Sequence, residues 1–182
     1  VLAHLLPALG VYAGPSSHVF AGSRQSARVN TVLVGPTSTG RKGTAFAPVD
    51  LLMEWVNERF WAAQKSGGLS SGEGLINAVA DKKHRNAEGE EEVEVVEKRL
   101  YVVEEEFSRV LTQAKREGNI LSQVIREAFD NGTLNVLTRG SPLQAKGAHI
   151  AITGHITLEE LTAKLSGSRW RTASETGSSG SR

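Results

Sequence analysis

The hydrophobic positions of this chain follow two patterns: continuous apolar runs, and runs that repeat with helical spacing. Continuous runs occupy 28–35, 99–107 and 148–153, and the turn residues that flank them predict buried β-strands. Apolar residues that recur about every 3.6 positions predict an amphipathic helix over 44–68. Further helices are predicted over 3–12, within 69–81, from 107 with a bend near 118, over 121–129 and over 157–165. Further strands are predicted over 18–22 and 133–138.

Strands and helices alternate along the chain, and this alternation predicts the fold class. Strands that are apolar on both faces and separated by helices are typical of an α/β fold with a mostly parallel central sheet and flanking helices. We expect one domain over 1–167, incomplete at both ends, with a charged, mobile and solvated loop over 82–98. The tail 168–182 is rich in Ser and Arg without periodicity, which predicts disorder.

Composition then excludes several classes of protein. The chain has 182 residues, no cysteine and a formal net charge of +1. It therefore has no disulfide, zinc ribbon or cysteine nucleophile, which suits a reducing cytoplasm. No apolar run reaches the ~20 residues that cross a bilayer, so no membrane partner is expected, and the charge gives no overall attraction to nucleic acid. Residues 1–17 lack the basic region of a signal peptide, and we interpret them as part of a longer chain.

A Gly-rich stretch after the strand 28–35 is the main candidate for chemistry. Residues 35–44 read GPTSTGRKGT, close to the P-loop pattern G-x-x-x-x-G-K-[ST], with Arg41 where that pattern has lysine. Amides of such a loop, backed by a helix N-terminus, bind phosphate, and a hydroxyl holds Mg²⁺. Lys42 is expected at the β/γ-phosphates and Thr44 at Mg²⁺; Arg41 is the alternative to Lys42, and a plain βα turn is the alternative to a phosphate site. The residues expected to bind ATP are Gly35, Thr39, Gly40, Arg41, Lys42, Gly43 and Thr44.

Three glutamates follow the apolar run that begins at 99. An acid at the end of a buried strand can hold Mg²⁺, and a neighbouring acid can polarise the attacking water. We expect Glu104 to hold the metal and Glu105 to activate water, on opposite faces if the strand continues. Glu73, in a Gly/Ser turn, is a second candidate for water activation, or simply an acid at a helix N-terminus.

His155 follows the strand 148–153 and is the third catalytic candidate, as a sensor of the γ-phosphate; local bonding of a partly buried histidine is the alternative. Ligands of open α/β sheets lie at the carboxyl ends of the strands. Loops 35–44, 104–105 and 153–157 are therefore expected to form one pocket. Thr157 and Glu160 have the spacing of a capping box.

Four motifs in this order, VLVGPTSTGRKGTA, GLSSGEGLI, LYVVEEEFSRVL and HIAITGHITLEEL, resemble a family of RecA-like P-loop ATPases from actinobacteria, phages and mobile elements. The resemblance covers roughly 1–165, and the family's loop has a similar G-R-K-G-T spelling. It implies a RecA-like core that binds ATP and Mg²⁺, hydrolyses ATP, and has a helicase-like role in DNA replication. It also implies DNA, a primase-polymerase module and, at full length, further copies of the chain as partners.

The tail 168–182 departs from that family. Back-translated with chosen codons and shifted by two bases, it reads AVANGFGNRFFWLS, similar to the family's next strand, so a frameshift near 168 is one interpretation. Such a C-terminal truncation predicts a missing strand, an open sheet edge, and weak or absent ATP hydrolysis. Two other functions stay open: a non-catalytic nucleotide-binding or assembly module, and a small-molecule phosphotransferase, ranked last because the sequence shows no second substrate pocket.

Overall fold

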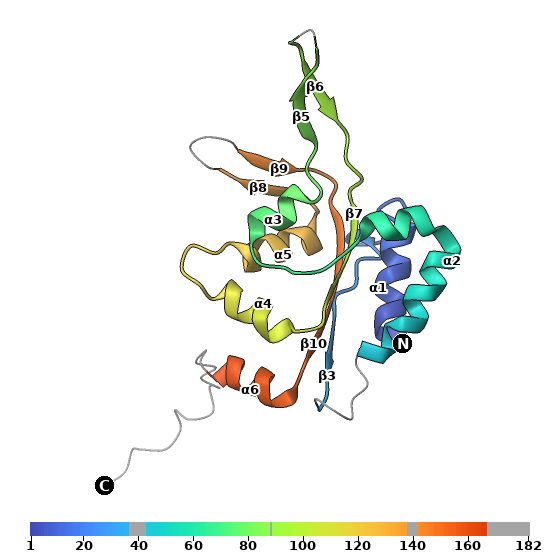
Figure 1. The fold of residues 1–182 in the computed structure, drawn as a ribbon, viewed down its shortest axis with the longest axis vertical. Helices are drawn as coiled ribbons and strands as arrows, with labels where there is room; N and C mark the ends of the chain where they lie inside the picture. Colours follow the sequence, from blue (N-terminus) through green and yellow to red (C-terminus); the bar gives the residue numbers. More distant parts are fainter. Residues whose placement is uncertain (37–42, 88, 138–141, 167–182) are drawn as a thin grey trace.

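The computed structural model describes residues 1–36, 43–87, 89–137 and 142–166. Its centre is a four-stranded parallel sheet with helices on both faces (Figure 1). The predicted α/β class, with a mostly parallel central sheet and flanking helices, is therefore confirmed. In spatial order the strands are β3 (Thr31–Val34), β10 (His149–Ile156), β7 (Arg99–Glu104) and β4 (Lys65–Ser66).

Side chains of the central strand β7 alternate between two apolar layers. Leu100 and Val102 pack in one cluster with residues of α3 and α5, whereas Tyr101 packs in the other with residues of α1 and α2. Burial on both faces explains why the central strands β7 and β10 read as apolar runs. β3 is an edge strand in which Val32 and Val34 are exposed, so the prediction of a buried strand within 28–35 is wrong in its burial. The helices on the first face are α3 (Gly72–Asn77), α4 (Phe107–Ala114) and α5 (Leu121–Asp130), with α6 (Leu158–Ser166) against α4, and those on the second are α1 (Leu2–Ala13) and α2 (Ala47–Gln64).

Antiparallel hairpins lie outside the central sheet. The predicted strands 18–22 and 133–138 do form, but each pairs with a close neighbour along the chain. These hairpins are β1 (His18–Ala21) with β2 (Ser23–Ser26), and β8 (Leu134–Val136) with β9 (Leu143–Ala145). Short loops make such local pairing entropically cheap, whereas the parallel strands need long crossovers.

The segment 82–98 contains a third hairpin, β5 (Lys82–Arg85) with β6 (Glu91–Glu94), where the sequence predicts a loop. It projects from the body of the molecule (Figure 1), and its strand residues are exposed, as expected of a solvated segment. Lys82 lies opposite Glu94 and Arg85 opposite Glu91. Opposite charges at facing positions stabilise strand pairing, so the charge blocks specify a hairpin here.

Two helix starts define the local structure near the candidate site. The predicted helix 44–68 begins later, as α2, after a single 3₁₀ turn, η1 (Gly43–Ala45), and is interrupted at Asn57, whose φ of −164° and ψ of 89° are not helical. The capping box before α6 is confirmed: Thr157 Oγ1 accepts from the Glu160 amide at 3.1 Å, and the Thr157 amide donates to Glu160 Oε2 at 3.1 Å.

Candidate functional site

The carboxyl ends of β3, β10 and β7 lie at one edge of the sheet. Because the strands are parallel and in register, Ile156 pairs with Val34 and Gly154 pairs with Glu104. The Gly35 amide continues this pairing by donating to the Ile156 carbonyl oxygen at 3.2 Å. The segments that follow Val34, Glu104 and Ile156 therefore start from the same edge, as the sequence predicts.

The chain leaves β3 and β10 toward opposite faces of the sheet. After β3 it continues to α2 on the α1 face, whereas after β10 it enters α6, which lies beside α4 on the other face (Figure 1). Ser108 of α4 donates to Glu160 of α6 at 3.1 Å and helps to fix this arrangement. A pair of neighbouring parallel strands whose connections diverge is a topological switch point, where open α/β sheets bind their ligands.

Part of the predicted phosphate loop falls outside the described residues. Thr39, Gly40, Arg41 and Lys42 are among those for which no structure is described. Gly35 follows β3, and Gly43 and Thr44 lie in η1, immediately before α2. The described ends of the loop thus have the strand before and the helix after that a phosphate loop needs.

Glu104, the predicted metal ligand, is the last residue of β7 and only 3% exposed. Its Oε1 accepts a hydrogen bond from the Leu69 amide at 2.5 Å. Leu69 follows β4 and the pair Gly67–Gly68, so this carboxylate holds the β4–α3 loop against the end of β7. No pattern in the sequence indicates this contact, because the partner of Glu104 is a backbone amide 35 positions away.

Glu105 lies in an exposed turn, whereas Glu73 lies at the start of a helix. Glu105 is exposed in the turn after β7, so the strand does not continue and the expected alternation of faces does not apply. Glu73 lies in the first turn of α3, where the helix dipole favours a carboxylate. Ser71 caps that helix by accepting from the Gly74 amide at 3.0 Å. The Glu104–Leu69 bond ties the loop that leads to Glu73 to the strand that leads to Glu105.

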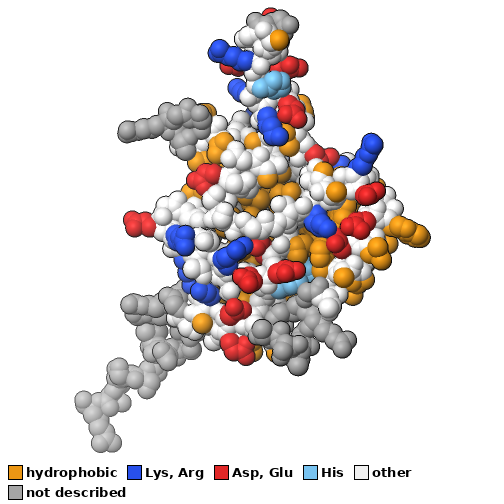
Figure 2. Space-filling model, viewed as in Figure 1, with side chains coloured by type: hydrophobic (Ala, Val, Ile, Leu, Met, Phe, Trp, Pro, Cys, Tyr) orange, Lys and Arg blue, Asp and Glu red, His pale blue; other side chains and the backbone are white. Residues whose placement is uncertain are grey.

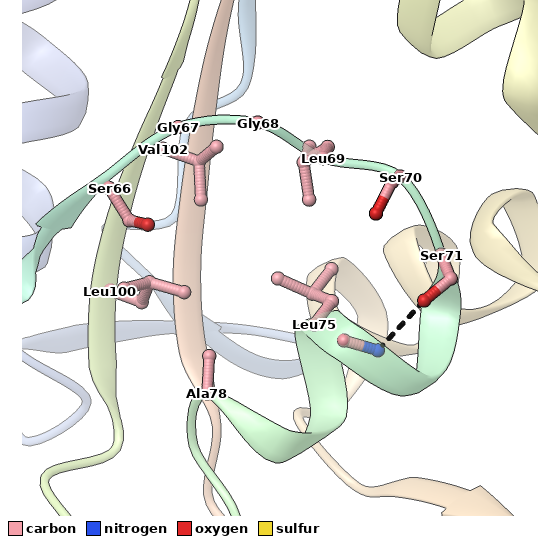
Figure 3. A pocket seen from close by; sticks show the side chains of 11 residues that line it. Ser66, Gly67, Gly68, Leu69, Ser70, Ser71, Leu75, Ala78, Leu100 and Val102 are labelled. Carbon is pink, nitrogen blue, oxygen red and sulfur yellow. Dashed lines mark hydrogen bonds between the residues drawn. The ribbon is translucent and has the colours of Figure 1, made fainter.

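A small pocket lies beneath the β4–α3 loop (Figure 3). It has a volume of about 150 Å³, with Ser66, Ser70 and Ser71 on the loop and Leu75, Leu100 and Val102 among the apolar residues that line it. It lies on the α3 face of β7, away from the switch point between β3 and β10. Its size and apolar walls do not suit a triphosphate.

Gly154 allows close packing at the same edge. A Cβ atom at this position would lie 2.5 Å from the ring of Phe107, the first residue of α4. Only a glycine lets that ring approach β10 so closely. Because Gly154 pairs with Glu104 in the sheet, the Phe107 ring also fixes the turn that contains Glu105.

His155 is buried on the α1 face and belongs to a polar cluster that the sequence did not predict. Its Nε2 lies 2.8 Å from Nε2 of His4, whose Nδ1 lies 3.0 Å from the Tyr101 hydroxyl. Tyr101 donates to Thr153, which lies 2.9 Å from the Thr31 hydroxyl. Polar residues at alternate positions of otherwise apolar strands were the available signal, since such residues point to the same face.

Burial shifts the pKa values of this cluster. Desolvation, followed by the positive charges that His155 and the chain N-terminus can have, lowers the pKa of His4 to about 4. Desolvation also raises the pKa of Tyr101 to about 12, against a smaller opposing effect of its bond to Thr153. Both side chains are therefore neutral near pH 7.

Acidic side chains surround the carboxyl edge. Glu105 and Glu106 are exposed in the turn after β7, and Glu159 and Glu160 are exposed in the first turn of α6, which follows β10. Figure 2 shows acidic side chains gathered on the lower side of the molecule. Such an edge favours a divalent cation and disfavours a bare anion. A Thr44 hydroxyl and the Glu104 carboxylate are oxygen ligands of the kind Mg²⁺ prefers, so the residues present fit the predicted ion chemically.

Comparisons with known proteins leave the family open. A scan against models of protein families and a search of curated proteins both returned no match to this chain. Within the described ranges, no cluster of three or more His, Asp or Glu side chains suited to a metal ion is present. No helix in those ranges is both long and apolar enough to cross a bilayer.

Proposed function

We propose that the protein is the ATP-binding core of a RecA-like P-loop ATPase, with a helicase-like role in DNA replication. The observation that supports this most is the parallel register, which brings Gly35, Glu104 and Ile156 to one edge of the sheet at a switch point. The family assignment rests on the four motifs in the sequence.

In this proposal each segment has one task. Amides of the loop 35–44 and the side chain of Lys42 bind the phosphates, and the N-terminus of α2 lies behind them. Thr44 and Glu104 would hold Mg²⁺, which would supply positive charge beside the phosphates. Glu105 or Glu73 polarises the attacking water. The acidic surroundings explain why ATP would bind as its Mg²⁺ complex.

Calorimetric titration with Mg²⁺·ATP tests this function. Lys42→Ala removes a charge-assisted contact worth about 1.5–3 kcal/mol and should weaken binding on the order of 10- to 100-fold. Lys146→Ala is the matched control, because Lys146 is exposed and precedes the amino end of β10. Arg41→Ala decides the register of the loop. Equal affinities for all of these proteins and the unmodified chain would refute a phosphate site here.

One observation favours a second candidate, a nucleotide-binding module without hydrolysis. An oxygen of Glu104 is already bonded to the Leu69 amide, and a ring nitrogen of His155 is bonded to His4. Two predicted site residues thus have structural partners. Glu105→Gln and Glu73→Gln, made in a homologous chain with an intact C-terminal strand, distinguish the candidates. A motor loses turnover in at least one variant, whereas a binding module keeps its affinity and shows no turnover to lose.

The proposed DNA and oligomer partners rest on the resemblance. The projecting β5–β6 hairpin has paired charges of both signs, so it does not strengthen the case for DNA. α2 exposes Leu51, Leu52 and Trp55, the last with 89% of its surface accessible, and subunit contacts could cover this apolar surface. Stimulation of ATP turnover by single-stranded DNA tests the DNA partner. Sedimentation with and without nucleotide tests whether copies of the chain assemble.

A further inference from the structure

A second pocket lies at the edge of the sheet where β10 begins, opposite the carboxyl edge. It has a volume of about 430 Å³ and is lined by residues of β2, of the end of α5 and of the start of β10. The lining residues that carry charge or hydrogen-bonding groups include Ser23, Arg24, Ser26, Arg28, Asp130 and Asn131. None of them belongs to the proposed nucleotide site.

Two guanidinium groups of this pocket have no carboxylate partner. Neither Arg24 nor Arg28 forms an ion pair within the described part of the chain. Arg24 Nη2 donates to the Pro15 carbonyl oxygen at 2.9 Å. Arg28 donates to the carbonyl oxygens of Ala128 and Asp130, at 2.8 Å and 3.2 Å. A guanidinium has five N–H donors, so each group keeps further donors for a ligand.

The charges of the lining leave one positive charge in excess. Arg28 is half-buried, and desolvation lowers its pKa against the opposing effect of nearby Asp130. The Asp130 side chain is exposed to water and balances only one of the two guanidinium charges. Desolvation also lowers the pKa of His149, which is therefore neutral near pH 7 and adds no charge. A partly desolvated charge is stabilised by a bound counterion, so the pocket favours an anion.

We propose that this pocket binds the carboxylate group of a small organic acid, held by the guanidinium groups of Arg24 and Arg28. Paired N–H donors of a planar guanidinium match the two oxygens of a carboxylate. A single carboxylate also neutralises the excess charge, whereas a phosphate dianion would leave negative charge beside Asp130.

Polar groups in the same pocket suit a hydroxyl group on that acid. Asn131 Oδ1 accepts from the Thr133 amide at 2.7 Å, which leaves the donors of the Asn131 side-chain NH₂ group for a ligand. Ser26, whose hydroxyl can donate or accept, is half-buried on the same lining. Lactate, which has one carboxylate and one hydroxyl group, is therefore a suitable probe.

Backbone amide NMR of the full chain, titrated with sodium lactate at constant ionic strength, tests the site. Lactate should shift the amide signals of Arg24, Asn131 and Gly147 in a saturable way and leave those of Gly35 and Glu104 unchanged. Sodium chloride should give no saturable shift, and inorganic phosphate should bind at these amides more weakly than lactate. The proposed nucleotide function does not enter this experiment, so either proposal can fail without the other.

Arg24→Gln should weaken lactate binding about tenfold, because it removes a charge-assisted contact. Arg116→Gln is the matched control, since Arg116 is exposed after α4 and does not line the pocket, and it should keep the affinity. The absence of saturable shifts at the pocket in the unmodified chain overturns the proposal whether or not Arg24→Gln folds. Equal affinity in Arg24→Gln and the unmodified chain, or tighter binding of phosphate than of lactate, overturns it as well.

Discussion

Lowering the pH from 7.5 to 5.0 should destabilise this fold, because His4 is buried in its neutral form. The folded pKa of His4 is about 4, whereas the unfolded chain has the ordinary value of 6.5. Between these values the unfolded state binds more protons, so stability falls as the pH drops below 6.5 and levels off below about 4. Proton linkage with these two pKa values gives a loss of about 2 kcal/mol at pH 5.0.

Urea unfolding at the two pH values, followed by tryptophan fluorescence, measures this loss. Trp61 is buried and stacked on Tyr101, so its emission reports the packing around His4. His149 is also buried, and desolvation lowers its pKa, so it adds to the loss in the same direction.

The variant His4→Gln isolates the share that belongs to His4. It should reduce the pH-dependent loss by about 2 kcal/mol. A pH dependence that stays the same in His4→Gln would refute the assignment of His4 as a buried neutral histidine.

Two further predictions concern the carboxyl edge. Gly154→Ala should cost about 1–3 kcal/mol of unfolding free energy, because the new Cβ would overlap the Phe107 ring; unchanged stability in urea would contradict this contact. Glu104→Ala should cost about 1–3 kcal/mol by leaving the Leu69 amide without its acceptor, whereas Glu104→Gln can still accept that bond and should cost less. If both Glu104 variants lose Mg²⁺-dependent ATP binding but only Glu104→Ala loses stability, the structural and metal roles are separated.

The sequence predicts a mostly parallel sheet but not the order in which its strands lie. The stretches 100–103 and 150–152 are apolar throughout, which marks strands covered on both faces. Nothing local indicates that β10, the last strand in the described part of the chain, lies between β3 and β7, because that pairing depends on contacts between distant segments. β4 has only two residues, Lys65 and Ser66, too few to form a pattern.

For the candidate site too, the location of the residues could be predicted from the sequence, but their contacts could not. The location of Glu104 and His155 at one edge follows from strand ends and parallel pairing, both of which the sequence indicates. Their partners do not follow from it: Glu104 binds a backbone amide, and His155 binds His4 from a helix 151 positions away in the chain. The charge of the run 82–98 alone predicts a solvated loop, whereas the complementary order of its two charge blocks indicates the β5–β6 hairpin.

The most direct test of the central claim locates the metal–nucleotide complex on the sheet. Mn²⁺·ATP in place of Mg²⁺·ATP broadens the NMR signals of nearby amides, and the effect falls steeply with distance. The account predicts broadening at Gly35, Glu104 and Ile156, which lie at the carboxyl edge, and sharp signals at Arg99 and His149, which begin β7 and β10 at the opposite edge. Broadening at Arg99 and His149 with sharp signals at the carboxyl edge, or no broadening at any amide, would contradict it.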